Sequence, residues 1–487
     1  MGLRFYNTLS RAKEEFAPAG STTARVYSCG PTVYSRQHIG NMRAAVFVDV
    51  LKRALRYDGY DVEDVVNITD VGHLASDEDE GEDKVARAAR ESGTDPADVA
   101  RHFEELYWDD LKRLNIVPPQ YRPRATEHIR EQVDFIRALE ARGLTYATDD
   151  GVYFDTEKLP RYGELSRQPL EGKEAGARVA VRGGKHNPRD FALWKFLVGE
   201  HAAHAMRWES PWGAGFPGWH IECSAMGRRY LGETIDIHTG GIEHIPIHHE
   251  NEIAQNEGSG LLTVRFWVHN EHLLLEGGKM SKSLGNILSL DDLAARGVSP
   301  LSFRYWLLTA HYRSPVNFTW AAVTGAQHAL SRLSQYAVSA RGGSDPPREE
   351  GQTLLAQTRT TQTYNDRFIE RINDDLDTPG ALAALWHMVK DDSVPIEEKR
   401  EALLDFDRVL GLGFKERGGE LAALAEEPVV PIENLPEDVQ NLVRERDKAR
   451  SEKDWARADA LRAAIHSRGV NIEDTARGSV ISFQKAP

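Results

Sequence analysis

The sequence has few cysteines, no long apolar run and no excess of positive charge. Its 487 residues include only two cysteines, Cys29 and Cys223, which exclude a disulfide framework and the cysteine spacing of a zinc finger. No stretch is long and apolar enough to span a bilayer, and polar residues interrupt the amino terminus where a signal peptide would need an apolar run. The net charge is −15, so nucleic acid would have to be bound locally rather than by a general positive field. We expect a soluble, cytoplasmic protein that binds neither membranes nor DNA.

The length and the first strand-like segments indicate an α/β fold. A chain of 487 residues is too long for one compact core, and we expect two to four domains. Residues 25–30 and 64–70 have the pattern of strands, and residues 42–57 between them have that of a helix. The order strand, helix, strand predicts a doubly wound, Rossmann-like parallel sheet. Ligands bind beyond the carboxyl ends of such strands, where Cys29 and Thr69 would lie.

The rest of the chain predicts an insertion, a return to the sheet and a helical region. A turn-rich stretch over 108–215 indicates an insertion, after which strands at 234–238 and 262–269 flank a helix at 248–256. Helical patterns then cover most of 321–427. A proline-rich break precedes residues 437–487, whose charged residues from 440 onward are ten basic and seven acidic, against the sign of the whole chain.

Two short motifs point to ATP chemistry at the α-phosphate. His38-Ile39-Gly40-Asn41 offers an imidazole and an amide beside a glycine at a helix N-terminus, where ATP can approach closely. Lys279-Met280-Ser281-Lys282-Ser283 offers two lysines on a loop that can neutralise a departing pyrophosphate. Either motif alone is also compatible with an ordinary turn or a basic surface loop. The two motifs occur in this order, separated by a domain's length of chain. In this respect the chain resembles a class I aminoacyl-tRNA synthetase.

Four side chains could form a metal site. His248 and Glu252 are four residues apart on a predicted helix, so they share one face. If the fold brings Cys29 and Cys223 to this face, the four donors suit zinc, which accepts two thiolates and tetrahedral geometry. The alternative is that each cysteine is a small buried apolar residue and that the histidines cap the helix.

Three segments resemble signature segments of cysteinyl-tRNA synthetase, namely residues 29–34, 218–224 and 248–252. The resemblance implies that Cys29, Cys223, His248 and Glu252 hold one zinc ion that binds the substrate thiol and selects against serine. It also implies ATP-dependent activation of L-cysteine to cysteinyl-adenylate, with magnesium on ATP, and transfer to the 3′-terminal adenosine of tRNA-Cys. The tail resembles an anticodon-binding module, in which Trp455 and Arg462 would contact tRNA and Trp455 could stack on a base. Alternatively, Trp455 packs between helices.

The resemblance also implies the roles of further residues. The expected catalytic residues are His38, Asn41, Lys279 and Lys282. The expected ATP-binding residues are His38, Gly40, Asn41, Gly240, Gly241, Glu243, Lys279, Ser281 and Lys282. The expected cysteine-binding residues are Gly30, Thr69, Trp219 and His238, with the Trp219 indole as one wall.

The same resemblance implies a domain plan. The expected parts are the two halves of the catalytic domain (1–107 and 216–277), the inserted connective subdomain (108–215), the lysine-loop and stem-contact region (278–320), the helical bundle (321–427) and the anticodon-binding module (437–487).

Three features depart from the family pattern. Asn41 replaces a common second histidine, Glu243 replaces a common aspartate at the ribose, and Val71-Gly72-His73 with the acidic loop 77–83 lengthens a shorter segment. Two rival functions remain open. One is a cysteine ligase that acylates a small amino-sugar acceptor, and the other is a catalytically silent RNA-binding paralogue.

Overall fold

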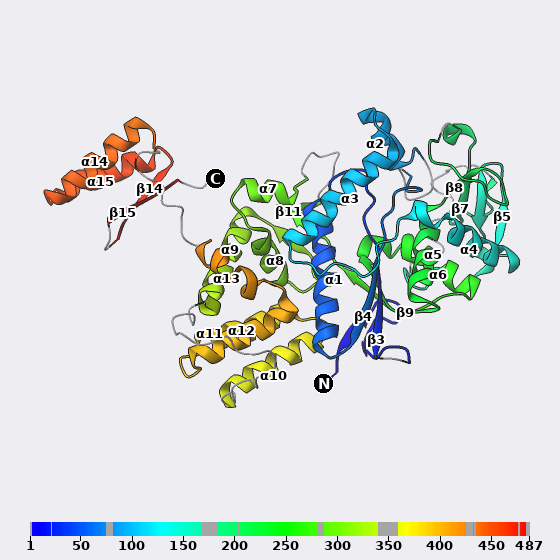
Figure 1. The fold of residues 1–487 in the computed structure, drawn as a ribbon, viewed down its shortest axis with the longest axis horizontal. Helices are drawn as coiled ribbons and strands as arrows, with labels where there is room; N and C mark the ends of the chain where they lie inside the picture. The colour runs from blue at the N-terminus through cyan, green and yellow to red at the C-terminus, as the bar shows by residue number, and fades with distance from the viewer. Residues whose placement is uncertain are drawn as a thin grey trace.

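The structure is a computed structural model (Figure 1). The structure describes residues 2–20, 22–74, 81–167, 184–202, 204–279, 287–338, 359–424, 432, 435–475 and 478–483. The parallel sheet lies near the middle, with the inserted subdomain on one side and the helical bundle on the other (Figure 1).

The central sheet has four parallel strands in the order β10, β9, β3, β4. These strands are β3 (Thr23–Ser28), β4 (Asp61–Val66), β9 (Thr234–Gly241) and β10 (Thr263–Asn270). Helix α1 (Ile39–Tyr57) connects β3 to β4, and α6 (His248–Ser259) connects β9 to β10. The strand order reverses direction between β3 and β9, which is where doubly wound sheets bind ligands. The α/β fold class predicted from the sequence is confirmed.

Alternating side chains of the strands meet helices on both faces of the sheet. Val26 and Val66 pack in the same core as α1, whereas Tyr27 and Val65 pack with Met226 of α5 (Trp219–Leu231). The strand predicted at 64–70 lies earlier in the chain, because β4 begins at Asp61 and ends at Val66. Beyond that point the backbone leaves the sheet, and Ile68 bridges to Arg124 while Thr69 bridges to Thr32.

The insertion has its own small antiparallel sheet, in the order β5, β6, β7, β8. These strands are β5 (Thr145–Ala147), β6 (Gly151–Phe154), β7 (Phe191–Phe196) and β8 (Gly215–Pro217), and α4 (Ile129–Ala141) packs with them. Before the sheet come α2 (Lys84–Ser92) and α3 (Pro96–Arg113). The domain boundary expected at residue 108 falls within helix α3. It stays a prediction.

The remaining elements are short strands and the helical region. The hairpin β1 (Arg4–Asn7) and β2 (Ala12–Glu15) precedes the central sheet, and β11 (Leu273–Leu275), β12 (Gly278–Lys279) and β13 (Val316–Phe318) form a small sheet after it. The helices that follow are α7 (Leu290–Ala295), α8 (Pro300–Leu308), α9 (Trp320–Val338), α10 (Arg359–Asn373), α11 (Thr378–Lys390), α12 (Ile396–Leu410) and α13 (Phe414–Ala423). The tail contains α14 (Glu437–Ser451), α15 (Trp455–His466), β14 (Val470–Thr475) and β15 (Gly478–Phe483), with a small core of its own. Among the described helices, none combines the length and apolar character that crossing a membrane requires.

A buried ion pair joins α1 to the helical region. The fully buried guanidinium of Arg304, on α8, donates to Asp49 Oδ2 at 2.6 Å and to the carbonyl oxygen of Leu410 at 2.8 Å. Burial alone would raise the pKa of Asp49, but the charge of Arg304 lowers it below the usual value. Removing either partner would leave the other charged and buried, which is strongly destabilising.

Asp70 anchors the insertion to the end of β4. Its carboxylate accepts hydrogen bonds from Thr126 N at 3.0 Å and from Thr126 Oγ1 at 2.6 Å. Burial raises the pKa of Asp70 from 3.8 to about 6. Since this pKa is higher in the folded than in the unfolded chain, the folded state binds the proton more tightly. Burying the ionised group therefore costs stability above pH 6, and this cost disappears as the pH falls below about 4.

Replacing Asp70 by Asn should remove this pH dependence, because an amide is neutral throughout and can still accept from the Thr126 N–H. The rise of the pKa from 3.8 to about 6 corresponds to roughly 3 kcal/mol, of which we expect about 1–3 kcal/mol to be recovered at pH 7.5. The melting temperature of the variant should exceed that of the wild type at pH 7.5, and the difference should shrink at pH 4.5. Asp149→Asn, on an exposed turn, is the control. A difference that does not change with pH would contradict this account.

Candidate functional site

A cavity of about 420 Å³ opens at the carboxyl ends of β3 and β9. Residues from the start of α1, including His38 and Asn41, line one part of it. Cys29, Cys223 and His248 line another part. The nucleotide motif and most of the candidate metal donors therefore share one cavity, although they come from four separate segments of the chain.

The turn before α1 is built as a helix cap. His38 is the N-cap residue, and its Nδ1 accepts a hydrogen bond from Gly40 N at 3.1 Å. Asn41 completes the capping box by accepting from His38 N at 3.2 Å. Because Nδ1 accepts, a neutral His38 carries its proton on Nε2, where it can donate to a phosphate. Asn41 thus serves as a cap without a positive charge.

The two glycines that end β9 allow the backbone to approach closely. A Cβ atom on Gly240 would lie 2.6 Å from His244 Nδ1, and one on Gly241 would overlap the Glu243 carboxylate. Glu243 Oε2 lies 3.6 Å from His272 Nδ1. Gly240, Gly241 and Glu243 all line the cavity. The backbone of Lys279 pairs with Leu274, whereas Ser281 and Lys282 lie outside the described residues.

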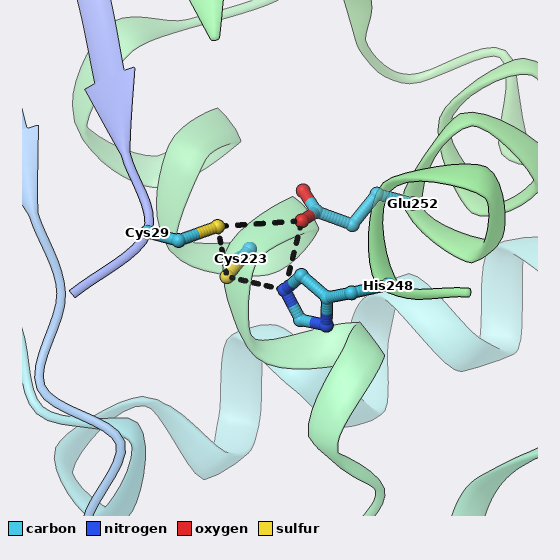
Figure 2. Close-up of side chains that lie close together, drawn as sticks. All are labelled: Cys29, Cys223, His248 and Glu252. Atoms are coloured by element: carbon cyan, nitrogen blue, oxygen red, sulfur yellow. Dashed lines mark hydrogen bonds and ion pairs between the residues drawn. The ribbon is translucent and has the colours of Figure 1, made fainter. Parts of the chain in front are cut away.

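The four predicted metal donors converge. Cys29 Sγ lies 4.0 Å from Cys223 Sγ and 3.8 Å from Glu252 Oε1, and Cys223 Sγ lies 3.6 Å from His248 Nε2 (Figure 2). His248 Nε2 lies 3.0 Å from Glu252 Oε1. Four such atoms lie within 4.8 Å of one another. The two sulfur atoms are too far apart for a disulfide bond.

These buried groups stabilise one another's protonation states. A hydrogen bond from the Cys29 thiol lowers the pKa of Cys223 to about 6, whereas burial raises the pKa of Cys29. Burial opposes a charge on His248, but hydrogen bonds to Cys223 and Glu252 raise its pKa to about 10. Burial likewise opposes a charge on Glu252, yet the charge of His238 outweighs it and the pKa falls well below the usual value. Cys223 and Glu252 are thus the anionic members of this buried cluster, and His248 balances their charge.

A second set of donors overlaps the first. Cys29 and Glu252 also lie together with His238 and His249, whose Nε2 is 3.2 Å from Cys29 Sγ. His238 Nε2 is 2.8 Å from Glu252 Oε2, and His249 Nδ1 is 2.8 Å from His269 Nε2. The sequence predicted His248 rather than its neighbour, and both imidazoles reach the cluster.

The predicted amino acid pocket rests on two residues that the sequence analysis missed. Gly30 N donates to Asn67 Oδ1 at 2.9 Å, and a Cβ on Gly30 would overlap the carbonyl oxygen of Asn67. Thr69 Oγ1 donates to Glu222 Oε2 at 2.9 Å. Burial raises the pKa of Glu222 well above its usual value. Only the position of Glu222 beside Cys223 could have suggested its role.

The two other predicted pocket residues lie in different places. Trp219, the first residue of α5, lines the cavity and stacks on His248 with ring centroids 4.2 Å apart. His238 is buried against Glu252 and the indole of Trp267, and it is not among the residues that line the cavity. Its position is that of a side chain that orients Glu252.

The two predicted tRNA contacts lie on α15, away from the cavity. The Trp455 side chain is 56% exposed, so it does not pack between helices. The guanidinium of Arg450 lies 5.6 Å from its ring centroid. Arg462 is also exposed. An exposed indole beside a cation is compatible with stacking on a base.

Comparison with known proteins identifies the family of this chain. The family profile of the class I (C) tRNA synthetase catalytic domain matches residues 15–328, and that of the cysteinyl-tRNA ligase anticodon binding domain matches residues 433–479. Cysteine–tRNA ligase 1 of Burkholderia lata is 45% identical over 98% of this chain and 96% of its own length. A cysteine–tRNA ligase of Thermus thermophilus is 42% identical, with 98% of each chain covered.

A solved structure shares the fold. Methionyl-tRNA synthetase of Mycobacterium tuberculosis, in complex with methionyl-adenylate, superposes with a TM-score of 0.55 at 17% identity and covers 82% of this chain and 93% of its own. From the two profiles and the full-length relatives, this chain belongs to the cysteine–tRNA ligase family of class I tRNA synthetases.

Proposed function

We propose that this protein activates L-cysteine with ATP to cysteinyl-adenylate and transfers the cysteinyl group to the 3′-terminal adenosine of tRNA-Cys. One observation carries the proposal: the His38 cap and the donors Cys29, Cys223 and His248 line the same cavity. A nucleotide at the start of α1 and an amino acid at the donor cluster would therefore meet within it. This reaction belongs to translation, which would place the protein in the cytoplasm.

The first step needs no protein nucleophile. The cysteine carboxylate attacks the α-phosphorus of ATP, the bond to the β-phosphate oxygen breaks, and pyrophosphate leaves with its magnesium. His38 Nε2–H and the first N–H groups of α1 stabilise the charge that develops on the phosphates. Lys279 and Lys282 would neutralise pyrophosphate from the lysine loop, and Gly240, Gly241 and Glu243 would face the adenosine. In the second step the hydroxyl of the tRNA adenosine attacks the activated carbonyl and releases AMP.

The donor cluster fits zinc. Ligand distances of 2.0–2.3 Å in a tetrahedral site put neighbouring donors about 3.3–3.8 Å apart. The spacings of 4.0, 3.8, 3.6 and 3.0 Å among Cys29, Cys223, His248 and Glu252 surround this range. We assign this set rather than the set with His238 and His249, because two thiolates suit zinc better than one. When bound, zinc would supply a position that favours a thiol over a hydroxyl.

A zinc ion in this pocket would serve to select cysteine over serine. Apolar contacts distinguish groups as similar as a thiol and a hydroxyl by only about 1–3 kcal/mol. Discrimination of about 10⁴ requires roughly 5.5 kcal/mol. Gly30, Thr69 and Trp219 would hold the amino acid backbone and its side chain, and His238 would act by orienting Glu252.

The domain plan follows from these roles. The catalytic domain would comprise residues 1–107 and 216–277, interrupted by the subdomain at 108–215. The region at 278–320 would contact the tRNA stem, and 321–427 would form the bundle that connects it to the anticodon-binding module at 437–487. The tail with its exposed Trp455 favours tRNA over a small acceptor.

The purified protein should charge total tRNA with cysteine and show cysteine-dependent exchange of pyrophosphate into ATP. Serine should support neither reaction at the same concentration. Exchange without charging would favour the small-acceptor ligase, and the absence of both reactions would favour the silent paralogue. The matched control is the same assay with tRNA omitted, in which exchange should persist and charging should not.

Zinc should be present at about one ion per chain, and Cys223→Ser should lower it severalfold while leaving the circular dichroism of the helical region unchanged. Cys223 belongs only to the first donor set, and His249 only to the second. His249→Gln is therefore the matched control and should retain the metal. Mass spectrometric metal analysis decides between the sets: loss in the His249 variant alone supports the second, and unchanged zinc in both variants removes the assignment.

Trp455→Ala should weaken tRNA binding, because stacking of a base on an indole contributes about 1–3 kcal/mol. We expect KM for tRNA-Cys in charging to rise about fivefold or more, with pyrophosphate exchange unchanged. Trp386→Ala, on α11, is a control for loss of an indole elsewhere. An equal rise in both variants would contradict a specific role for Trp455.

A further inference from the structure

A three-ring stack crosses the amino acid side of the cavity. The His73 imidazole lies on the Trp219 indole with ring centroids 4.0 Å apart and planes 6° apart. The His248 imidazole lies on the same indole with centroids 4.2 Å apart and planes 29° apart. Two imidazoles whose centroids lie this close to one indole would overlap if they shared a face, so they occupy its opposite faces. Trp219 is therefore held between a candidate metal ligand and His73.

Both ring nitrogens of His73 take part in hydrogen bonds. The Lys84 ammonium lies 2.5 Å from His73 Nε2, and Thr32 Oγ1 lies 2.5 Å from His73 Nδ1. An ammonium can only donate, so Nε2 accepts and a neutral His73 carries its proton on Nδ1, facing the Thr32 oxygen. These two bonds fix the orientation of the imidazole plane, and the Trp219 indole stacks against that plane.

The backbone around His73 is also fixed. Gly72 has φ +81°, and a Cβ there would lie 2.6 Å from the carbonyl oxygen of Pro217, just before α5. Gly72 N donates to the buried carboxylate of Asp83 at 2.7 Å, and the same carboxylate caps α2. Lys84 N donates to the carbonyl oxygen of His73 at 3.0 Å. The contacts of Gly72 and the start of α2 thus seat His73 against Trp219, the first residue of α5.

We infer that His73 is a positioning residue for the amino acid substrate: it holds the Trp219 indole in the orientation that forms the wall of the cysteine pocket. This inference rests on the proposed function. His73 acts through the indole and takes no part in proton or phosphoryl transfer. Lys84 and Thr32 hold the His73 imidazole in the orientation that this role requires.

The test is steady-state pyrophosphate exchange by the full-length, zinc-loaded enzyme with cysteine and ATP varied separately. His73→Ala should raise KM for cysteine about two- to tenfold, the effect expected from one lost aromatic contact. KM for ATP should stay within about twofold, and zinc content should not change. His73→Phe keeps a flat ring against the indole and should restore most of the affinity for cysteine.

Two further variants separate positioning from general damage. Lys84→Met removes the ammonium that fixes the ring and should raise KM for cysteine in the same direction as His73→Ala, by a smaller factor. His186→Ala is the matched control, because His186 also stacks on an aromatic ring, that of Tyr146, at 3.7 Å and 9° but in the insertion. It should change neither KM.

The outcomes are distinct. Wild-type activity with an unchanged KM for cysteine in His73→Ala would overturn the inference and leave the proposed function standing. Equal losses in both KM values and in kcat, without rescue by phenylalanine, would show a general structural role and would also overturn it. A wild type without cysteine-dependent exchange would overturn the proposed function itself.

Discussion

The parallel pairing of β3 with β9 is the contact on which the site depends. Val26 pairs with Ile237 and Ser28 pairs with Thr239, although about 210 residues separate the two strands in sequence. This pairing creates the reversal of strand order at which the cavity opens. It places Cys29, at the end of β3, beside the two glycines that end β9, and it leaves α5 and α6 to bring Cys223, His248 and Glu252 to the same point.

A buried carboxylate shapes the chemistry around that point. Glu252 is almost fully buried, and it is stabilised as an anion by His238 on one oxygen and His248 on the other. Such a charge is costly in the interior unless it is paired and hydrogen-bonded. The surrounding imidazoles meet this need, and a divalent cation between the thiols would meet it further. The cluster is therefore a place where polar groups compensate one another and where removing one affects several.

Much of the architecture could be predicted from the sequence, because it depends on local patterns. The alternation of apolar runs with a helical pattern after residue 25 identifies β3, α1 and β4, and the four-residue spacing of His248 and Glu252 places both on one helix face. The convergence of the four donors was predicted from the family resemblance alone, since no spacing relates residue 29 to residue 223. No role was predicted for Asn67, Glu222 or His73, because their partners are set by tertiary contacts: Thr69 and Glu222 are 153 residues apart. For the same reason, sequence could not distinguish the reach of His248 from that of His249.

The long separation between β3 and β9 also has a consequence for synthesis of the chain. At roughly 5–20 residues per second, about 10–40 s pass between emergence of β3 from the ribosome and emergence of its partner β9. During that interval β3 and β4 can pair around α1, but the other edge of β3 has free N–H and C=O groups, of the kind that favour aggregation. The insertion, with its own sheet and core, is synthesised within the same interval. The nascent catalytic sheet is therefore most vulnerable while the insertion is being made, and the translation rate through that segment sets how long the edge stays open.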